Sequence, residues 1–319
     1  MYDVCFASMN YELVKEIEMN RFEKVIKPSV WLAALLLTGL VAGCGGQDPI
    51  LGTSVIKSGV ATPGNPGGSL GVLAPFGIAA YGGVTDTGIS KINGDVVLHP
   101  TYQCNAVPIL FTDGPGFGNC GGNAANIPTH NAGDKVITSI YPDTTTAPNV
   151  MASLLAKWNS ISPAGTPGAK VLGCGTIGTG GGGGSGTGCA LNATLPPGVY
   201  ISASSTTIGV TGDLTLNGGP TDVWIFQVPS ALTSAGSSRI LLTGGAKASN
   251  VWWFVGSSAT LGTGSTFNGN ILASASITML NLATSCGRLL AGAEGSGAFV
   301  LDTNIVSVPG NPNAPVGCQ

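Results

Sequence analysis

The side chains in this chain that could do chemistry carry hydroxyl and amide groups rather than charges. The stretch from Ala259 to Leu280, ATLGTGSTFNGNILASASITML, contains no charged residue and mixes Thr, Ser, Asn, Ala and Gly with scattered aliphatic residues. Hydroxyls and amides exchange hydrogen bonds with water. A threonine also carries a methyl group, which can occupy a void in an ordered water cage. At a regular spacing, such groups could bind a lattice of ordered water.

Repeated segments in the second half of the chain predict how these side chains are positioned. DVWIFQV at 222–228 recurs as NVWWFVG at 250–256, and GNILAS at 269–274 recurs as GRLLAG at 287–292. Three kinds of short strand return in the same order every 18 to 30 residues. This pattern is typical of a β-solenoid, in which each coil contributes three strands. We expect its interior to contain ladders formed by Leu214, Leu216, Ile240, Leu242, Ile271, Leu272, Leu289 and Leu290.

Outward positions of a solenoid repeat at the strand spacing, which is roughly 4.8 Å. The sequence predicts one outward column that contains Thr211, Thr233, Thr263, Asn281 and Thr303. Further threonines are expected close to it, namely Thr260, Thr266, Thr278 and Thr284. Together they would form a flat, rigid face of hydroxyl and methyl groups with almost no charge. Such a face lacks the aromatic and arginine anchors that protein interfaces favour, so it suits ordered water better than a protein partner.

Other kinds of chemistry find little support in the composition. Only 8% of the 319 residues are charged and the formal net charge is −3, which argues against a nucleic-acid partner. The polar residues that a polysaccharide lyase or hydrolase would need occur singly, as Asp213, Asp302, Glu294, Arg239 and Arg288. There are only two histidines, and no CxxC motif occurs. We therefore expect no enzyme, no metal site and no cofactor.

The N-terminal region is predicted to direct export. Residues 19–43 have a basic start, the apolar run Trp31 to Val41 and small residues at the end, as in a secretory signal. The segment LVAGC at 40–44, where this signal ends, resembles the lipobox of bacterial lipoproteins, which implies lipidation at Cys44. Residues 1–18 are interpreted as a leader upstream of the true start, and 44–69 as a Gly/Pro-rich tether. These features predict a lipoprotein at the outer membrane or cell surface, or otherwise a secreted protein.

Apart from Cys5 in the leader and Cys44, six cysteines remain. Export to an oxidising compartment permits disulfides between them, with 15 possible connectivities. Proximity in sequence favours Cys104–Cys120 and Cys174–Cys189, and elimination leaves Cys286–Cys318. A buried free thiol at Cys286 is the alternative for the third pair.

One helix is predicted near residues 147–162. Apolar residues recur at spacings near three and four from Val150 to Ile161, with Leu155 and Trp158 on the same side. Thr146 is the expected N-cap, Pro148 falls in the first turn and Pro163 ends the helix.

Residues 70–308 resemble the ice-binding protein family of bacteria and fungi. The resemblance is carried by INGDV at 92–96, LPPGVY at 195–200, the run at 254–273, GRLLAG at 287–292 and VLDTNIV at 300–306. It implies an all-β fold for residues 70–319, a right-handed, discontinuous, three-faced β-solenoid with one long α-helix alongside. It also implies a monomer that adsorbs to ice, with thermal hysteresis and inhibition of ice recrystallisation.

The family motif Thr-Ala/Gly-X-Thr/Asn is matched by Thr263 to Thr266. Ser234 after Thr233 and Leu282 after Asn281 depart from it. The alternative function is that of a lipid-anchored adhesin, which would bind a surface other than ice, such as a polysaccharide.

Overall fold

A computed structural model of the chain describes residues 69–318 except 89, 101–102, 105–106, 109–128, 131–135, 139–143, 182–185 and 203–206. The predicted leader, signal, lipidation site and nearly all of the tether therefore lie outside the described residues, and so does Cys120 of the predicted Cys104–Cys120 pair.

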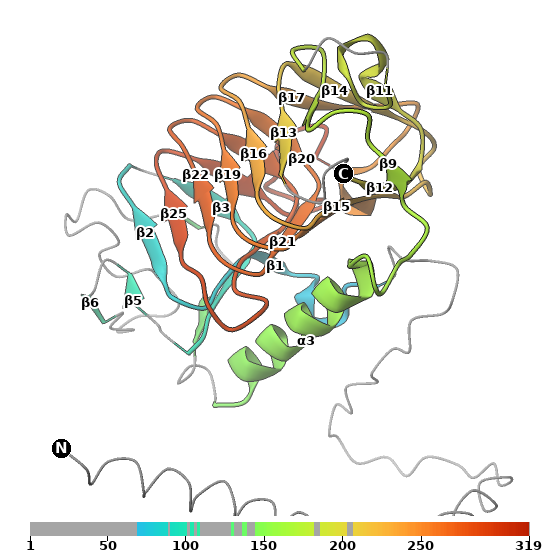
Figure 1. Cartoon of the computed structure of the whole chain (residues 1–319). Helices are drawn as coiled ribbons and strands as arrows, with labels where there is room; N and C mark the ends of the chain where they lie inside the picture. Colours follow the sequence, from blue (N-terminus) through green and yellow to red (C-terminus); the bar gives the residue numbers. More distant parts are fainter. Residues whose placement is uncertain are drawn as a thin grey trace, which may run out of the picture. The chain divides into compact units, whose positions relative to one another are not determined.

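Three sheets run along a stack of coils, and each full coil contributes one strand to each sheet (Figure 1). Sheet A has nine strands, in the spatial order β8 (Val136–Thr138), β4 (Asp95–Leu98), β1 (Phe76–Ala80), β24 (Leu289–Leu290), β21 (Asn270–Ala273), β18 (Val251–Val255), β15 (Trp224–Val228), β12 (Gly198–Ile201) and β9 (Lys170–Val171). All pairings within it are parallel.

Sheet B also has nine strands, in the order β10 (Thr176–Ile177), β13 (Ile208–Val210), β16 (Leu232–Ser234), β19 (Ala259–Leu261), β22 (Ile277–Met279), β25 (Phe299–Leu301), β2 (Val84–Asp86), β5 (Gln103–Cys104) and β6 (Val107–Pro108). Sheet C has eight, in the order β11 (Thr194–Leu195), β14 (Asp213–Asn217), β17 (Arg239–Thr243), β20 (Thr266–Asn268), β23 (Thr284–Cys286), β26 (Ile305–Ser307), β3 (Lys91–Asn93) and β7 (Thr129–His130). These strands, with helix α3 (Thr146–Ile161), confirm the three-faced solenoid predicted from the repeats.

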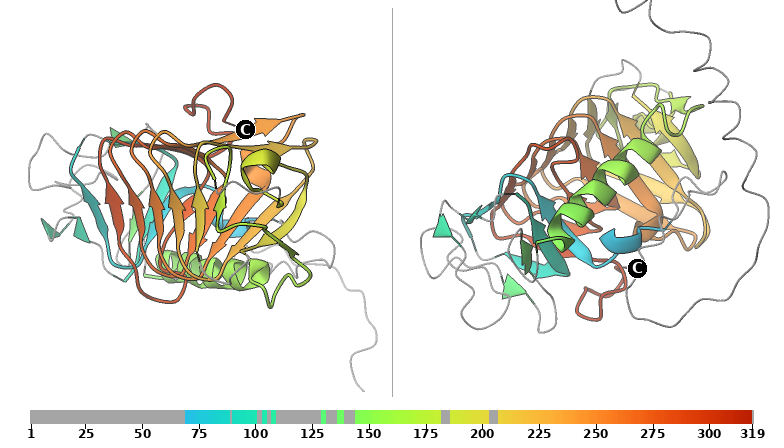
Figure 2. Two further views of the ribbon diagram at one scale, coloured as in Figure 1. Left: turned by 45° about the horizontal axis from the view of Figure 1, so that its top comes forward. Right: turned by 90° about the horizontal axis from the view of Figure 1, so that it is seen from below.

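The stack does not follow the order of the chain. Strand β1 pairs with β4 on one side and with β24 on the other, so the first coils continue the stack beyond the last ones. Helix α3 then carries the chain back along sheet A, and the remaining coils are laid down from β9 to β26 (Figure 2). Three short 3-10 helices complete the described elements, at Gly71–Leu73, Ala190–Asn192 and Ala248–Asn250.

The solenoid interior holds one aliphatic and aromatic core. Leu214, Leu216, Ile240, Ile271 and Leu289 point into it as predicted, and Leu242 packs against it while partly buried. Within the core an aromatic stack crosses successive coils. The ring centroids of Tyr200 and Phe226 are 5.5 Å apart, those of Phe226 and Trp253 4.0 Å, and those of Trp253 and Phe267 5.2 Å.

The prediction was wrong for Leu272 and Leu290, which lie on the opposite side of sheet A. Together with Trp252 and Phe254 they form a second core against the helix. Both sides of this sheet are therefore buried, and β15 and β18 are buried at every position. Successive residues of a strand point to opposite sides, so adjacent apolar residues such as Leu289 and Leu290 serve one core each.

Helix α3 begins at Thr146, one residue earlier than predicted, and Thr145 rather than Thr146 is its N-cap. Its buried residues are Ala147, Val150, Met151, Leu154, Trp158 and Ile161. Leu155, predicted on the same side, is instead 40% exposed. Trp158 donates a hydrogen bond from Nε1 to the Val255 carbonyl at 3.1 Å. The amide of Gln227 donates to the Ile161 and Ser162 carbonyls, which supplies partners for the helix C-terminus.

A lysine of the helix, Lys157, lies against sheet A. The Lys157 ammonium lies 4.2 Å from the ring centroid of Trp252, where a cation is attracted by the face of the indole. Burial nevertheless lowers the pKa of Lys157 to about 8. Sheet A is thus closed to external ligands along the length of the helix.

Two of the three predicted disulfides are confirmed. Cys174–Cys189 closes the loop around β10, and Cys286–Cys318 fastens the C-terminal segment to β23 of sheet C. The second pairing excludes the alternative of a free thiol at Cys286. No helix in the described part of the chain is long and apolar enough to span a lipid bilayer.

Candidate functional site

Only one of the three faces is open and uncharged over several coils. Helix α3 covers sheet A, as the view from below in Figure 2 shows. Sheet C carries a surface ion pair and the fastened C-terminal segment. Sheet B has neither a helix over it nor an ion pair among its described side chains, and Figure 1 shows its strands β13 to β2 side by side.

The central residue of each three-residue strand of sheet B points outward. In β13, β16, β19, β22 and β25 the first and third residues are buried and the second is partly or fully exposed. These central residues are in register across the sheet. We call this set the sheet B column, which consists of Thr176, Gly209, Thr233, Thr260, Thr278, Val300 and Thr85.

A second set of polar side chains lies at the corner where the chain passes from sheet B to sheet C. Backbone hydrogen bonds connect neighbouring corners, from Gly264 N to the Asn281 carbonyl at 2.9 Å and from Leu282 N to the Asp302 carbonyl at 3.2 Å. We call Gly236, Thr263, Asn281 and Asp302 the corner row. The residue after each has a left-handed backbone, with φ values between 56° and 65° at Ser237, Gly264, Leu282 and Thr303. This shared conformation keeps the corners stacked.

The left-handed conformation is unfavourable for residues other than glycine. Leu282 and the β-branched Thr303 adopt it at φ values of 60° and 56°. The backbone at these two corners is therefore in an intrinsically unfavourable conformation. Contacts with the neighbouring coils must offset its free-energy cost.

Seven of the nine predicted contact residues fall into three groups, and Thr303 and Thr211 lie outside them. Thr233, Thr260 and Thr278 belong to the sheet B column, whereas Thr263 and Asn281 belong to the corner row. Thr303 follows the row by one residue, and Thr211 follows the end of β13. Thr266 and Thr284 are paired on sheet C, where their hydroxyls are 3.4 Å apart.

The predicted single column through Thr211, Thr233, Thr263, Asn281 and Thr303 is therefore wrong in its register. The partner of Thr233 is Thr260, three residues before Thr263. The prediction also missed Thr85 and Thr176, which lie before the region where the repeats are recognisable. The signal for them is weak: Thr85 lies between Val84 and Asp86, and Thr176 lies between Gly175 and Ile177, each in a short strand.

Sheet C presents a mixed surface. Its first outward position holds Asp213, Arg239, Thr266, Thr284, Ile305 and Lys91 on successive coils. The Arg239 guanidinium donates two hydrogen bonds to Asp213, at 2.8 Å and 2.6 Å. This hydrogen bonding, aided by the positive charge, lowers the pKa of the Asp213 carboxyl. Sheet C thus mixes charged, apolar and hydroxyl groups at positions where sheet B has mainly hydroxyls.

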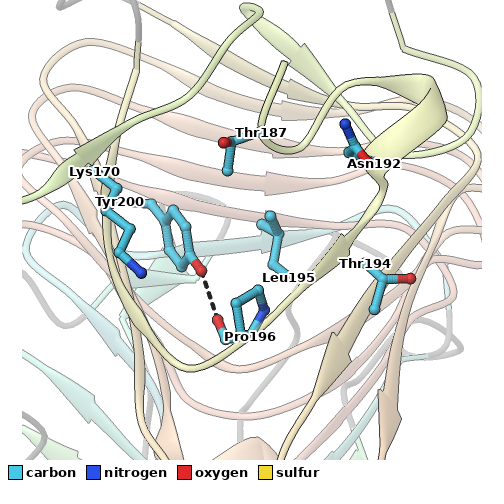
Figure 3. Close-up of a pocket in the computed structure, with 7 residues that line it drawn as sticks. All are labelled: Lys170, Thr187, Asn192, Thr194, Leu195, Pro196 and Tyr200. Carbon is cyan, nitrogen blue, oxygen red and sulfur yellow. Dashed lines mark hydrogen bonds between the residues drawn. The ribbon is translucent and has the colours of Figure 1, made fainter. Parts of the chain in front are cut away.

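A small pocket of about 280 Å³ lies at the β9 end of the stack (Figure 3). It is lined by Lys170, Thr187, Asn192, Thr194, Leu195, Pro196 and Tyr200. The Tyr200 hydroxyl donates to the Pro196 carbonyl at 2.6 Å, so its proton is engaged in a hydrogen bond within the protein. The lining contains neither a carboxylate nor a histidine, and no group of three possible metal ligands occurs anywhere in the described ranges.

Comparison with known proteins identifies relatives of the whole solenoid. A family model described as "Ice-binding-like" matches residues 78–307. An ice-binding protein from Flavobacterium frigoris is 29% identical over 306 residues, which covers 90% of this chain and 99% of that protein. One from a Nostoc species is 35% identical over 241 residues and covers 75% of this chain and 73% of that protein.

Solved structures show the same architecture. The ice-binding protein of the ascomycete Antarctomyces psychrotrophicus has a TM-score of 0.54 at 28% identity, covering 75% of this chain and 97% of that one. An ice-binding protein with antifreeze activity from an Arctic yeast has a TM-score of 0.62 at 23% identity, covering 79% and 98%. At 23% identity, the similarity to the yeast protein supports the fold alone, which is the solenoid with its accompanying helix.

Proposed function

The chain belongs to the ice-binding-like family, and we propose that it adsorbs to ice through the sheet B column and the corner row. The observation that supports this choice is the register of Thr233, Thr260 and Thr278, three outward threonines on consecutive coils. Sheet A is covered by α3, and sheet C places Arg239 and Asp213 beside its threonines. Sheet B is therefore the face on which hydroxyl and methyl groups are least disturbed by charge.

Adsorption to ice demands many weak contacts made at once. A hydroxyl that binds ice gives up a bond to liquid water, so each contact contributes little net free energy. Threonines stacked in register at roughly 4.8 Å repeat the same contact along the sheet. Because parallel strands on both sides hold the backbone of this column, little conformational entropy is lost when the face binds.

The effect on freezing follows from irreversible adsorption. Ice between bound molecules can advance only as curved fronts, and curvature lowers the local freezing temperature. Thermal hysteresis and inhibition of recrystallisation are the expected consequences in solution.

The proposal is tested by growing ice slowly in a solution of the purified protein. We expect the protein to be enriched in the ice fraction, the crystals to be shaped and recrystallisation to stop at low concentration. Albumin at equal concentration, which should stay in the liquid, serves as control. Exclusion from ice together with binding to a polysaccharide would instead support the adhesin interpretation.

We further propose that the protein is exported as a monomer and held at the cell envelope by a lipid on Cys44, which would keep the ice-binding activity at the cell surface. The LVAGC sequence at 40–44 supports this proposal. In a bacterial expression host that acylates lipoproteins, Cys44→Ala should move the protein from the membrane fraction into the soluble exported fraction, because no acyl chain would anchor it. Ser54→Ala in the predicted tether, which leaves Cys44 in place, is the matched control. Persistence of Cys44→Ala in the membrane fraction would contradict lipidation.

A further inference from the structure

The coil that contains β25 interrupts both sets of polar side chains on the proposed ice-binding face. In the sheet B column Val300 stands between Thr278 and Thr85, with the same branched shape but without a hydroxyl. In the corner row Asp302 follows Thr263 and Asn281. Among the described members of the column and the row, Asp302 is the only charged residue.

Asp302 changes its neighbours as well as its own position. Asn281 donates a hydrogen bond from Nδ2 to Asp302 Oδ1 at 3.2 Å, and Thr303 donates from Oγ1 to the same oxygen at 3.3 Å. The carboxylate thus orients the amide of the preceding corner toward itself. The hydrogen bonds described for its side chain all reach Oδ1, and Asp302 is only partly buried.

The backbone around Asp302 is held independently of its carboxylate. Its N–H donates to Asn304 Oδ1 at 2.6 Å, and its carbonyl accepts from Leu282 N at 3.2 Å. Asn304 is buried and donates in turn to the carbonyls of Leu280 and Ala283. A change confined to the Asp302 side chain therefore leaves this corner in place.

We infer that Asp302 limits ice adsorption at the coil of β25, an inference that rests on the function proposed above. A carboxylate binds liquid water more strongly than an uncharged group does, so bringing it against a crystal requires its hydration shell to be removed. Because the Asn281 amide donates a hydrogen bond to Asp302, that N–H group is not available to bind ice. The coil of β25 consequently weakens contact at two corners.

The test is Asp302→Asn, which keeps the shape of the side chain and an oxygen that can accept from Asn281. Thermal hysteresis and the fraction captured by ice are measured at equal molar concentration. We expect both to rise by roughly twofold, the size expected for a small change in binding free energy. Val300→Thr, which restores the missing hydroxyl without changing shape, should raise them further in combination.

Asp213→Asn is the matched control, because it removes the same charge from the same solenoid, but on sheet C. It should leave both measurements unchanged. If Asp302→Asn leaves ice capture unchanged or lowers it, the inference is wrong, and an equal rise in Asp213→Asn would attribute the effect to net charge and also overturn it. A separate variant, Thr260→Tyr, reports on the face itself: if it retains full activity, the proposed face fails, whereas its loss of activity beside an unchanged Asp302→Asn rejects the limiting role alone.

Discussion

Thr260→Tyr should reduce thermal hysteresis and ice capture at least about tenfold while leaving the fold intact. Thr260 is the middle member of three consecutive threonines, between Thr233 and Thr278 in register. A tyrosine ring at this position stands above the plane of its neighbours, so contact with a flat crystal surface is lost on both adjoining coils. Good shape complementarity is a requirement of any tight interface, and here the partner cannot adjust.

The matched control is Thr266→Tyr on sheet C. Thr266 belongs to the same coil as Thr260, is exposed and is the first residue of a three-residue strand. The two variants carry the same substitution on different faces, and circular dichroism and melting temperature confirm that both fold. Activity retained in Thr260→Tyr and lost in Thr266→Tyr would assign ice binding to sheet C instead.

Phe226→Ala should lower the free energy of unfolding by about 4 kcal/mol, the usual cost of removing a buried aromatic side chain. Phe226 is fully buried and stacks between Tyr200 and Trp253, with centroid distances of 5.5 Å and 4.0 Å. The cavity would lie between three coils, whose backbones are fixed by parallel pairing and cannot close around it. For a domain of this size the melting temperature should fall by roughly 10 °C.

Chemical denaturation measures this difference, and Leu155→Ala on the exposed side of α3 is the control. Leu155 is 40% exposed, so its truncation should change stability by less than about 1 kcal/mol. A loss for Phe226→Ala no larger than that of Leu155→Ala would show that the aromatic stack does not hold the coils together.

Much of the fold could be predicted because each coil repeats the same requirements. The recurrence of DVWIFQV as NVWWFVG corresponds to β15 and β18, which are paired residue by residue. The helix was predictable from its apolar spacing, since Val150, Leu154, Trp158 and Ile161 all face the sheet. These features depend on local pattern, which a sequence displays directly.

The register of the candidate site was harder to predict, because corners differ in length. From Thr260 to Thr266 the chain advances six residues, but from Val300 to Ile305 it advances five, although both pairs occupy equivalent strand positions. Because the corner after Val300 is one residue shorter, Thr303 occupies the position equivalent to Leu282, and Asp302 occupies the position equivalent to Asn281. Similarly, alternation along a strand cannot tell which side is buried when both are, as for Leu289 and Leu290.

The pairing of β1 with β24 has a consequence for the order of events during synthesis. Ile78 and its partner Leu289 are separated by more than 200 residues of chain. Contacts between such distant segments form slowly, because a long loop must close first. Strand β1, the first described strand, therefore keeps one edge unpaired until β24 has been made, and a chain that ends before β24 would expose that edge to other molecules.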